Sequence, residues 1–329
     1  NYLNDAYSGL YVVDRTMGSD MYVGTEQNNS AYLALTLTPY PWIEAHGGLR
    51  YEYNRQKIGA AIPTGAGRPI SEPVLTDHSS GQWLPSINVS LKPTEQWTLR
   101  VAYGKTVNRT EFREVSPFRE LDFENNTEIS GNPNLVSARV ENYDVRLEYY
   151  PNTDKGDAIS FGAFYKEITN PIERVNTSSR VISLFPSISF SNATSATVKG
   201  LELELRKSLA FLPGALFRDL SIIANASLID SWTKYENLSA TSTMIGERPL
   251  QGQAPFLVNA GLYYDNAAWG TRIAGIYNYA GENIYAVGLG ERYNSFIDGP
   301  EYRGSLIELP RHLLDFSATQ RIGKGMQLK

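Results

Sequence analysis

Apolar and polar side chains alternate with a period of two along this chain, and no other feature constrains its fold as strongly. In the clearest run, 142–149, the two classes interleave: Tyr143, Val145, Leu147 and Tyr149 with Asn142, Asp144, Arg146 and Glu148. Successive side chains of a β-strand point to opposite sides, so this run has one dry face and one wet face. We therefore expect an all-β fold.

The same alternation recurs about eleven times along the chain. The runs are 33–38, 49–54, 86–91, 99–104, 142–149, 159–166, 201–205, 220–230, 256–264, 272–279 and 314–321. With their flanks, most approach the roughly nine to eleven residues that a tilted strand needs to cross a bilayer. A twelfth run begins at 326–329. We expect further strands to complete this sheet, because an open edge in hydrocarbon leaves its amides unpaired.

The connections between these runs alternate between short and long. The short ones, rich in turn formers, are 38–42, 92–96, 151–157, 265–269 and 322–325, with a longer one at 206–219. The long ones are 57–80, 106–138, 169–194, 232–251 and 281–307. Short turns at one rim and long loops at the other are typical of outer-membrane barrels, whereas such long connections are uncommon in a soluble sandwich. The rhythm favours an antiparallel transmembrane β-barrel.

Aromatic residues support this interpretation. The chain contains 21 Tyr and 5 Trp, and several border the short turns: Tyr40, Trp42, Trp97, Tyr149, Tyr150 and Trp269. Amphipathic rings at strand ends suit a girdle at the level of the lipid headgroups. No stretch is long and apolar enough to cross a bilayer as a helix, so a helical membrane protein is excluded.

Several function classes find no support in the composition. The chain has no cysteine, and its three histidines, His46, His78 and His312, lack the spacing of a zinc site. The net charge of -5 arises from intermixed acidic and basic residues, so we expect no nucleic-acid partner. Neither a metal site nor a bound cofactor is expected.

Catalysis finds no support either. The motifs of hydrolase elbows, zinc proteases, P-loops and dinucleotide sites are absent from suitable contexts. The carboxylate pairs Asp144 with Glu148 and Glu202 with Glu204 lie on alternating strands, and we interpret them as solvated residues that face the lumen. We expect the protein not to be an enzyme.

Seven segments carry a family resemblance as an ordered set. They are 84–93 (LPSINVSLKP), 99–114 (LRVAYGKTVNRTEFRE), 131–135 (GNPNL), 142–151 (NYDVRLEYYP), 161–172 (FGAFYKEITNPI), 200–205 (GLELEL) and 309–325 (LPRHLLDFSATQRIGKG). Together they resemble the barrel of TonB-dependent receptors, particularly those of the Bacteroidetes, over residues 26–329. Within this set, 131–134 has the composition of a tight turn.

The resemblance implies a barrel of about 22 strands with an N-terminal plug inside it. On this basis, residues 1–329 are a partial outer-membrane β-barrel domain from the C-terminal portion, with about 11–12 strands present. The plug and first strands would be absent from it and the last strands truncated. The resemblance also implies the outer membrane of a Gram-negative bacterium and active import of an extracellular ligand.

Ligand contacts are expected on the long connections, which a rigid scaffold presents to the outside. The second long connection offers Arg109, Arg113 and Arg119 for pairing with an acidic ligand or stacking on an aromatic one. The fifth offers Tyr285 and Tyr293 for stacking on sugar or catechol rings. Alternatively, these charges pair with each other or with lipopolysaccharide, and tyrosines are common in exposed loops.

The sequence therefore predicts an outer-membrane receptor that imports a small-molecule, siderophore, glycan or peptide ligand in a TonB-dependent manner. Expected partners are outer-membrane lipid, lipopolysaccharide and TonB acting through the plug, with a surface lipoprotein as a further candidate. Two alternatives remain open. One is a structural or adhesion barrel, such as a subunit of a surface complex, and the other is a passive porin.

Overall fold

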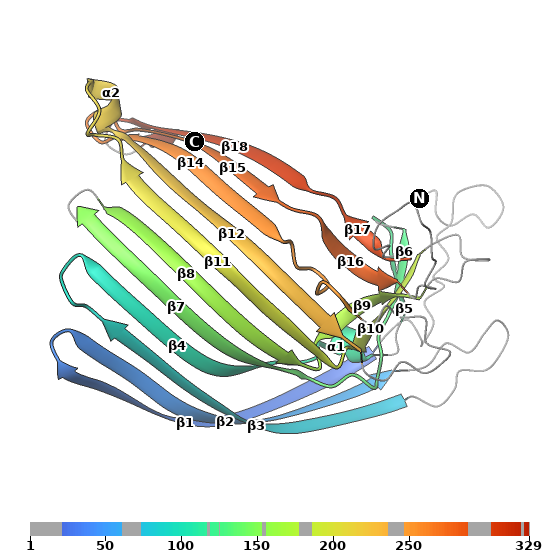
Figure 1. The fold of residues 1–329 in the computed structure, drawn as a ribbon. Coiled ribbons are helices and arrows are strands. Elements are labelled where there is room, and N and C mark those ends of the chain that lie inside the picture. The colour runs from blue at the N-terminus through green and yellow to red at the C-terminus, as the bar shows by residue number, and fades with distance from the viewer. Residues whose placement is uncertain are drawn as a thin grey trace, which may run out of the picture.

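The computed structural model describes residues 22–60, 74–116, 119–124, 126–152, 156–177, 186–235, 247–288, 304–323 and 326–328. Most of these residues lie in β-strands, which form two hydrogen-bonded sheets (Figure 1). The larger sheet has thirteen strands and the smaller one has six. The prediction of an all-β fold is therefore confirmed.

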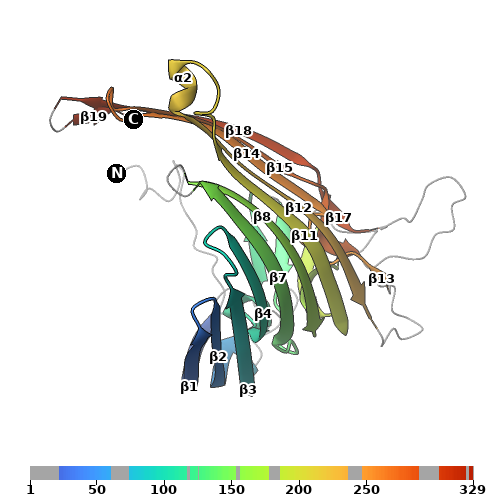
Figure 2. The same cartoon turned by 60° about the vertical axis from the view of Figure 1, so that its left-hand side comes forward.

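The larger sheet is an antiparallel wall that follows the order of the chain. Its main path is β1 (Tyr22–Tyr40), β2 (Ile43–Ala60), β3 (Val74–Leu91), β4 (Trp97–Asn108), β7 (Ala138–Asn152), β8 (Asp157–Thr169), β11 (Ser195–Ser208), β12 (Leu220–Lys234), β14 (Phe256–Asn266), β15 (Thr271–Ala280), β18 (Arg311–Ile322) and β19 (Met326–Leu328). The short strand β13 (Glu247–Arg248) pairs with β12 outside this path. The wall is strongly curved (Figure 1, Figure 2). The alternation located every strand of the main path.

Strand register brings apolar side chains together on one face of the wall. Val101 of β4 lies opposite Val145 of β7, and Val145 lies opposite Ala163 of β8. Ala163 in turn lies opposite Leu201 of β11. Opposed residues share a face of the sheet, so the apolar face is continuous across these strands. Val145 and Leu147 remain 46% and 41% exposed, which fits a face turned to lipid and contradicts a closed apolar core.

The first three strands are longer than the sequence predicts. β1, β2 and β3 contain 19, 18 and 18 residues, well beyond the roughly nine to eleven that cross a bilayer. The predicted connection 57–80 is therefore too long, because β2 continues to Ala60 and β3 begins at Val74. Two hydrogen bonds of 2.9 and 2.6 Å from Arg55 to Asp77 join the extended ends.

The smaller sheet forms from the long connections and is not predicted by the alternation. Its order is β17 (Leu306–Glu308), β16 (Asn283–Gly288), β9 (Ile172–Asn176), β10 (Ser187–Asn192), β6 (Thr127–Ser130) and β5 (Arg119–Asp122). The β9–β16 and β6–β10 pairs are parallel. Two short helices, α1 (Phe112–Val115) and α2 (Ala215–Arg218), lie near opposite rims of the wall (Figure 1). Across the described segments, no helix has the length and apolar character needed to span a membrane.

A small apolar core attaches the second and third long connections to the wall. Its four buried residues are Ile58 of β2, Val115 of α1, Phe190 of β10 and Leu135, which follows the turn at 131–134. Ile58 points to the opposite side of β2 from Tyr53, whose side chain is exposed on the apolar face. The described parts of these two connections therefore fold over the inner face of the wall at one rim.

Two neighbouring residues of β4 test the assignment of the faces. Val101→Arg places a guanidinium on the lipid side and is expected to destabilise the barrel by about 2–4 kcal/mol. Ala102→Arg places the same group on the inner face, opposite Asp144, and is expected to cost less than about 1 kcal/mol. Equilibrium unfolding of the complete barrel in phospholipid vesicles measures both values. Equal destabilisation by the two substitutions would contradict the assignment.

Candidate functional site

The inner face of the wall carries a ladder of paired charges. Arg100 Nε donates to Glu148 Oε2 at 3.1 Å, and Arg146 Nε donates to Glu148 Oε1 at 3.0 Å. Arg146 also pairs with Glu204, and Arg100 donates to Ser90 at 3.1 Å. The inward orientation predicted for Glu148 is confirmed. Its solvation is not, because two guanidinium groups cover the carboxylate and leave the residue buried.

The second long connection is anchored to β2 by polar side chains. Arg109 pairs with Glu52, a buried carboxylate that Arg50 also contacts. Beside this pair, the Thr110 hydroxyl donates to Gln56 Oε1 at 2.9 Å, and Gln56 Nε2 donates to the Thr110 carbonyl at 2.8 Å. Both partners on β2 lie on its inner face. The first predicted ligand residue, Arg109, is thus placed where it holds the connection to the wall.

The other two predicted arginines lie at the surface of the same connection. Arg113 Nη2 lies 3.0 Å from Glu120 Oε2, and Arg119 Nη1 lies 3.2 Å from Glu128 Oε1. All four side chains are exposed. Exposed ion pairs contribute little to stability, so a carboxylate partner is readily exchanged for another anion. Arg113 and Arg119 therefore present guanidinium groups that a ligand can reach.

The predicted turn at 131–134 closes this connection against its own helix. Asn132 Oδ1 accepts a hydrogen bond from the Asn134 N–H at 3.0 Å, as in an Asx turn, and Asn132 Nδ2 donates to the Phe190 carbonyl at 2.9 Å. A Cβ atom on Gly131 would lie only 2.0 Å from the carbonyl oxygen of Ser116. The interpretation of this segment as turn chemistry is confirmed, and glycine is required there for close approach.

Tyr285 of β16 is paired with a cation that the sequence did not single out. The guanidinium of Arg174, on β9, lies over the Tyr285 ring at 5.1 Å from its centroid. The charge of Arg174 also acts on the Glu114 carboxyl of α1. Burial raises the pKa of that carboxyl, and the positive charge of Arg174 counteracts part of the rise. Tyr293, the other predicted stacking residue, lies outside the described residues. The pairing of Arg174 with Tyr285 depends on strand contacts that no local pattern reveals.

These connections offer groups for binding an anionic or aromatic ligand. Guanidinium groups pair with carboxylate or phosphate in two-pronged geometry and also stack on rings. Within the described ranges, no cluster of three or more His, Asp or Glu side chains has the arrangement to hold a metal ion. A ligand captured here would be recognised by charge and ring contacts.

Two rows of aromatic rings border the apolar face. In the row predicted at the short turns, Tyr40 stacks on Trp42 at 5.9 Å and Trp97 on Tyr149 at 4.4 Å. A second row, nearer the long connections, was not predicted. Contacts within it join Tyr51 to Trp83 and Tyr103 to Tyr143 to Tyr165. Because such rings gather at the headgroup level, the two rows fit the two interfaces of a membrane.

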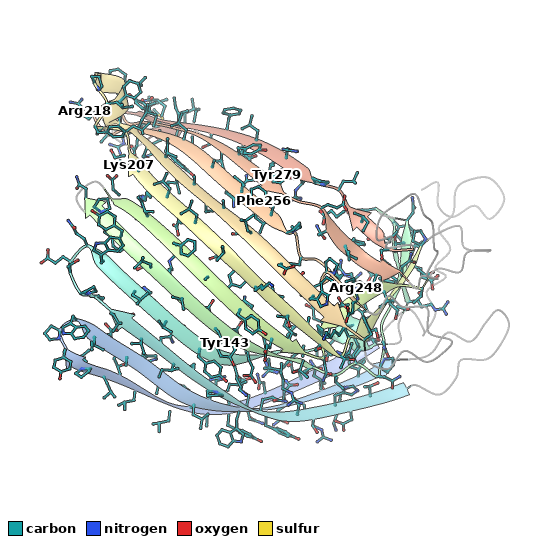
Figure 3. All side chains as sticks on the ribbon, viewed as in Figure 1. Tyr143, Lys207, Arg218, Arg248, Phe256 and Tyr279 are labelled. Atoms are coloured by element: carbon teal, nitrogen blue, oxygen red, sulfur yellow. The ribbon has the colours of Figure 1, made fainter. Side chains whose placement is uncertain are left out.

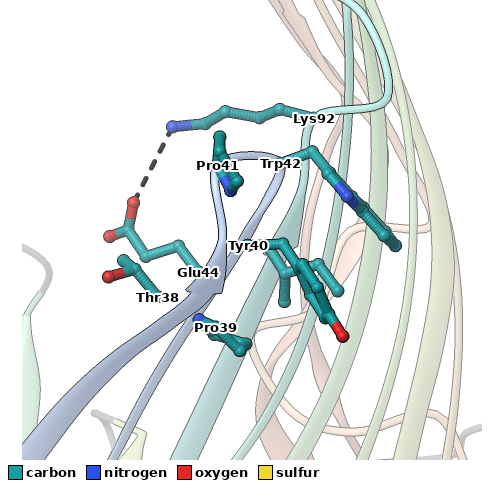
Figure 4. Close-up of a pocket in the computed structure, with 8 residues that line it drawn as sticks. Thr38, Pro39, Tyr40, Pro41, Trp42, Glu44 and Lys92 are labelled. Atoms are coloured by element: carbon teal, nitrogen blue, oxygen red, sulfur yellow. Dashed lines mark ion pairs between the residues drawn. The ribbon is translucent and has the colours of Figure 1, made fainter.

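A pocket of about 310 Å³ lies at the turn between β1 and β2, lined by residues 38–44 and Lys92 (Figure 4). The Lys92 backbone N–H donates to the Trp42 carbonyl at 2.7 Å, which ties this turn to the next one. Lys92 Nζ lies 3.8 Å from the Glu44 carboxylate, and both side chains are about half exposed. The pocket is at the rim of the short turns, away from the predicted ligand residues.

The family model described as TonB dependent receptor-like, beta-barrel, matches residues 1–329. The chain therefore belongs to the TonB-dependent receptor β-barrel family. This is the family that the ordered segments of the sequence resemble, and the wall described above is its antiparallel barrel wall. The Bacteroidetes origin and the place of the chain in the C-terminal portion stay predictions.

Solved structures with a similar fold come from several receptors. The siderophore receptor PiuA from Acinetobacter baumannii is 12% identical with a TM-score of 0.63, over 93% of this chain and 38% of that one. The ferric yersiniabactin uptake receptor FyuA from Yersinia pestis is 15% identical with a TM-score of 0.57, over 91% and 39%. The copper transporter OprC is 13% identical with a TM-score of 0.63, over 92% and 41%.

At these identities the likeness concerns the fold alone. The chain covers 38%, 39% and 41% of the lengths of the three solved structures, respectively. No curated protein matches its sequence. The arrangement of the wall is thus shared with receptors of this family, while the ligand has to be argued from the connections.

Gly131→Ala tests the close approach of the turn to α1. The added methyl group meets backbone oxygens, so the connection must shift, at an expected cost of about 1–3 kcal/mol to its local stability. A protease added to intact cells cleaves the receptor where it is exposed, and mass spectrometry of the fragments measures the exposure of the connection. Gly59→Ala is the control, because its Cβ meets nothing within 4 Å. Equal protection in both variants would contradict the role given to Gly131.

Proposed function

We propose that this chain forms part of the wall and outer surface of a receptor that binds an extracellular ligand and imports it with energy relayed by TonB. The observation that carries the proposal is the family match over residues 1–329. In this proposal the protein lies in the outer membrane of a Gram-negative bacterium. Residues 1–329 are then a partial barrel domain, and TonB acts on a plug inside the complete barrel.

The inner face supports a role in passage of a polar ligand. Arg100, Arg146 and Glu148 keep this face polar, while pairing prevents a strong field of one sign. A lumen of this kind accepts a polar plug or a polar ligand with little desolvation cost, because its own charges are already compensated. The wall therefore suits a channel that is filled and emptied.

The proposed ligand is a small metal chelate of the siderophore class. PiuA and FyuA, which share the fold, are described as siderophore and ferric yersiniabactin receptors, and OprC as a copper transporter. Arg113, Arg119 and Tyr285 supply charge and ring contacts for an anionic, aromatic chelator. A chelate carries its metal with it, so the protein needs no metal ligands of its own. Glycans and peptides are the competing ligand classes.

We also propose that lipid and lipopolysaccharide surround the outer face. Phospholipid chains would cover the apolar band between the two aromatic rows. Beyond the second row, Lys105 pairs with Glu141 at 2.8 Å and Lys199 with Asp230 at 3.1 Å on the same outer face. Exposed ammonium groups at this height suit the sugar-phosphate region of lipopolysaccharide.

Deletion of TonB tests the import step. Cells that carry the complete receptor are expected to take up a radiolabelled ferric siderophore, and deletion of TonB is expected to reduce uptake to the level of receptor-free cells. Binding at the cell surface is expected to persist, because the connections do not depend on the energy supply. Uptake that continues unchanged would indicate a passive porin. Lack of binding by any siderophore, glycan or peptide would favour a structural or adhesion role.

Arginine variants separate ligand contacts from anchoring contacts. Arg119→Ala and Arg113→Ala are expected to weaken ligand binding about tenfold each, since charged hydrogen bonds are worth about 1.5–3 kcal/mol. Arg109→Met is expected to lower stability by about 1–3 kcal/mol, because it removes a partner from buried Glu52. Titration with a ferric siderophore and thermal unfolding measure the two effects. The assignment fails if Arg113 and Arg119 affect only stability.

A further inference from the structure

One carboxylate joins two of the long connections directly. Glu173 of β9 is fully buried, and each of its oxygens accepts two hydrogen bonds. Oε1 accepts from Arg248 Nη1 at 2.9 Å and from the Gln251 N–H at 3.2 Å. Oε2 accepts from Arg248 Nη2 at 2.6 Å and from the Tyr235 hydroxyl at 2.8 Å. We call these four residues, Glu173, Tyr235, Arg248 and Gln251, the Glu173 cluster.

The cluster also reaches a third connection. Gln251 Nε2 donates to the Tyr285 carbonyl of β16 at 3.0 Å, and Gln251 Oε1 lies 3.4 Å from the Arg174 N–H of β9. Next to it, the Gly252 N–H donates to the Ile284 carbonyl at 2.8 Å. Figure 3 shows Arg248 at the end of the wall where the smaller sheet meets it. The charge pair itself joins the third and fourth long connections, and hydrogen bonds from the neighbouring Gln251 and Gly252 attach the fifth.

The charges in this cluster are matched, and neither can be left alone. The Glu173 and Arg248 side chains are both 0% exposed. The loss of either one therefore leaves the other as an unpaired charge in an environment that solvates charge poorly. Burial raises the pKa of Tyr235, which keeps its hydroxyl protonated as the donor to Glu173. If the third or the fourth connection moves away by itself, it must break this pair, and if the fifth moves away it must break the hydrogen bonds from Gln251 and Gly252. Separate movement is therefore opposed, and joint movement is not.

We propose that Glu173 and Arg248 are positioning residues that make three described segments of these connections and their flanks, 172–177, 247–252 and 283–288, behave as one body over the ligand site. The inference rests on the proposed function, because it assigns the regulation of the same extracellular surface. It explains how Tyr285 and Arg174, from two connections, are held together for contact with one ligand. The coupling itself is a property of the protein without ligand.

Hydrogen exchange of the complete, ligand-free receptor in detergent micelles tests the coupling. Glu173→Gln and Arg248→Met each leave one buried partner uncompensated. Exchange in segments 172–177, 247–252 and 283–288 is expected to rise together, on the order of 100-fold in each. Strands β7 and β8 are expected to keep their protection, which shows that the barrel is folded. A rise confined to the segment around the substituted residue would overturn the proposal.

The double variant Glu173→Gln with Arg248→Met removes both charges and is expected to recover most of the protection in all three segments. If the single variants fail to assemble, the double variant still tests the proposal. Exchange rates that change by different factors in the three segments would again overturn it. Lys199→Met breaks an exposed pair on the outer face and serves as the control, with a change of less than about fivefold. The exchange experiment uses neither a ligand nor an energy source. Its result therefore tests the coupling even if the proposed import function is wrong.

Discussion

Hydrocarbon offers no hydrogen-bond partner to a peptide group, and the wall of this protein depends on that constraint. Antiparallel pairing from β1 to β19 lets the peptide groups of neighbouring strands hydrogen-bond to each other. The side chains are then free to divide between the two faces of the sheet. A register that places Val101, Val145 and Ala163 side by side keeps one face apolar. A slip of one residue would carry Arg146 to the lipid side, so the pattern and the pairing fix each other.

Charges on the other face are tolerated because they are matched. Glu148 lies between two guanidinium groups within the span of the wall, and Glu173 lies against Arg248 among the long connections. The first arrangement keeps the lumen polar without a strong field of one sign. The second joins described segments of two separate connections. Both follow from the same cost, that of a buried charge without a partner.

A fold of this kind tolerates wide variation in sequence. Receptors that share 12–15% of their residues with this chain adopt the same arrangement, since the wall needs alternation, turn formers and interface rings rather than particular residues. The connections carry no such requirement and are free to diverge. In the function proposed above, ligand specificity belongs to Arg113, Arg119, Arg174 and Tyr285 and their neighbours, where the fold imposes the least.

The sequence by itself determined the wall strands, their order, the apolar face and the turn at 131–134, because alternation and turn chemistry involve neighbours along the chain. It missed the smaller sheet, whose strands β5, β6, β9 and β10 have only 4 to 6 residues, too few for a pattern. It grouped three arginines that the structure separates into one anchor and two surface residues. Only tertiary structure decided these roles and the Glu173 pair with Arg248, 75 residues apart, since long-range pairing leaves no local signal.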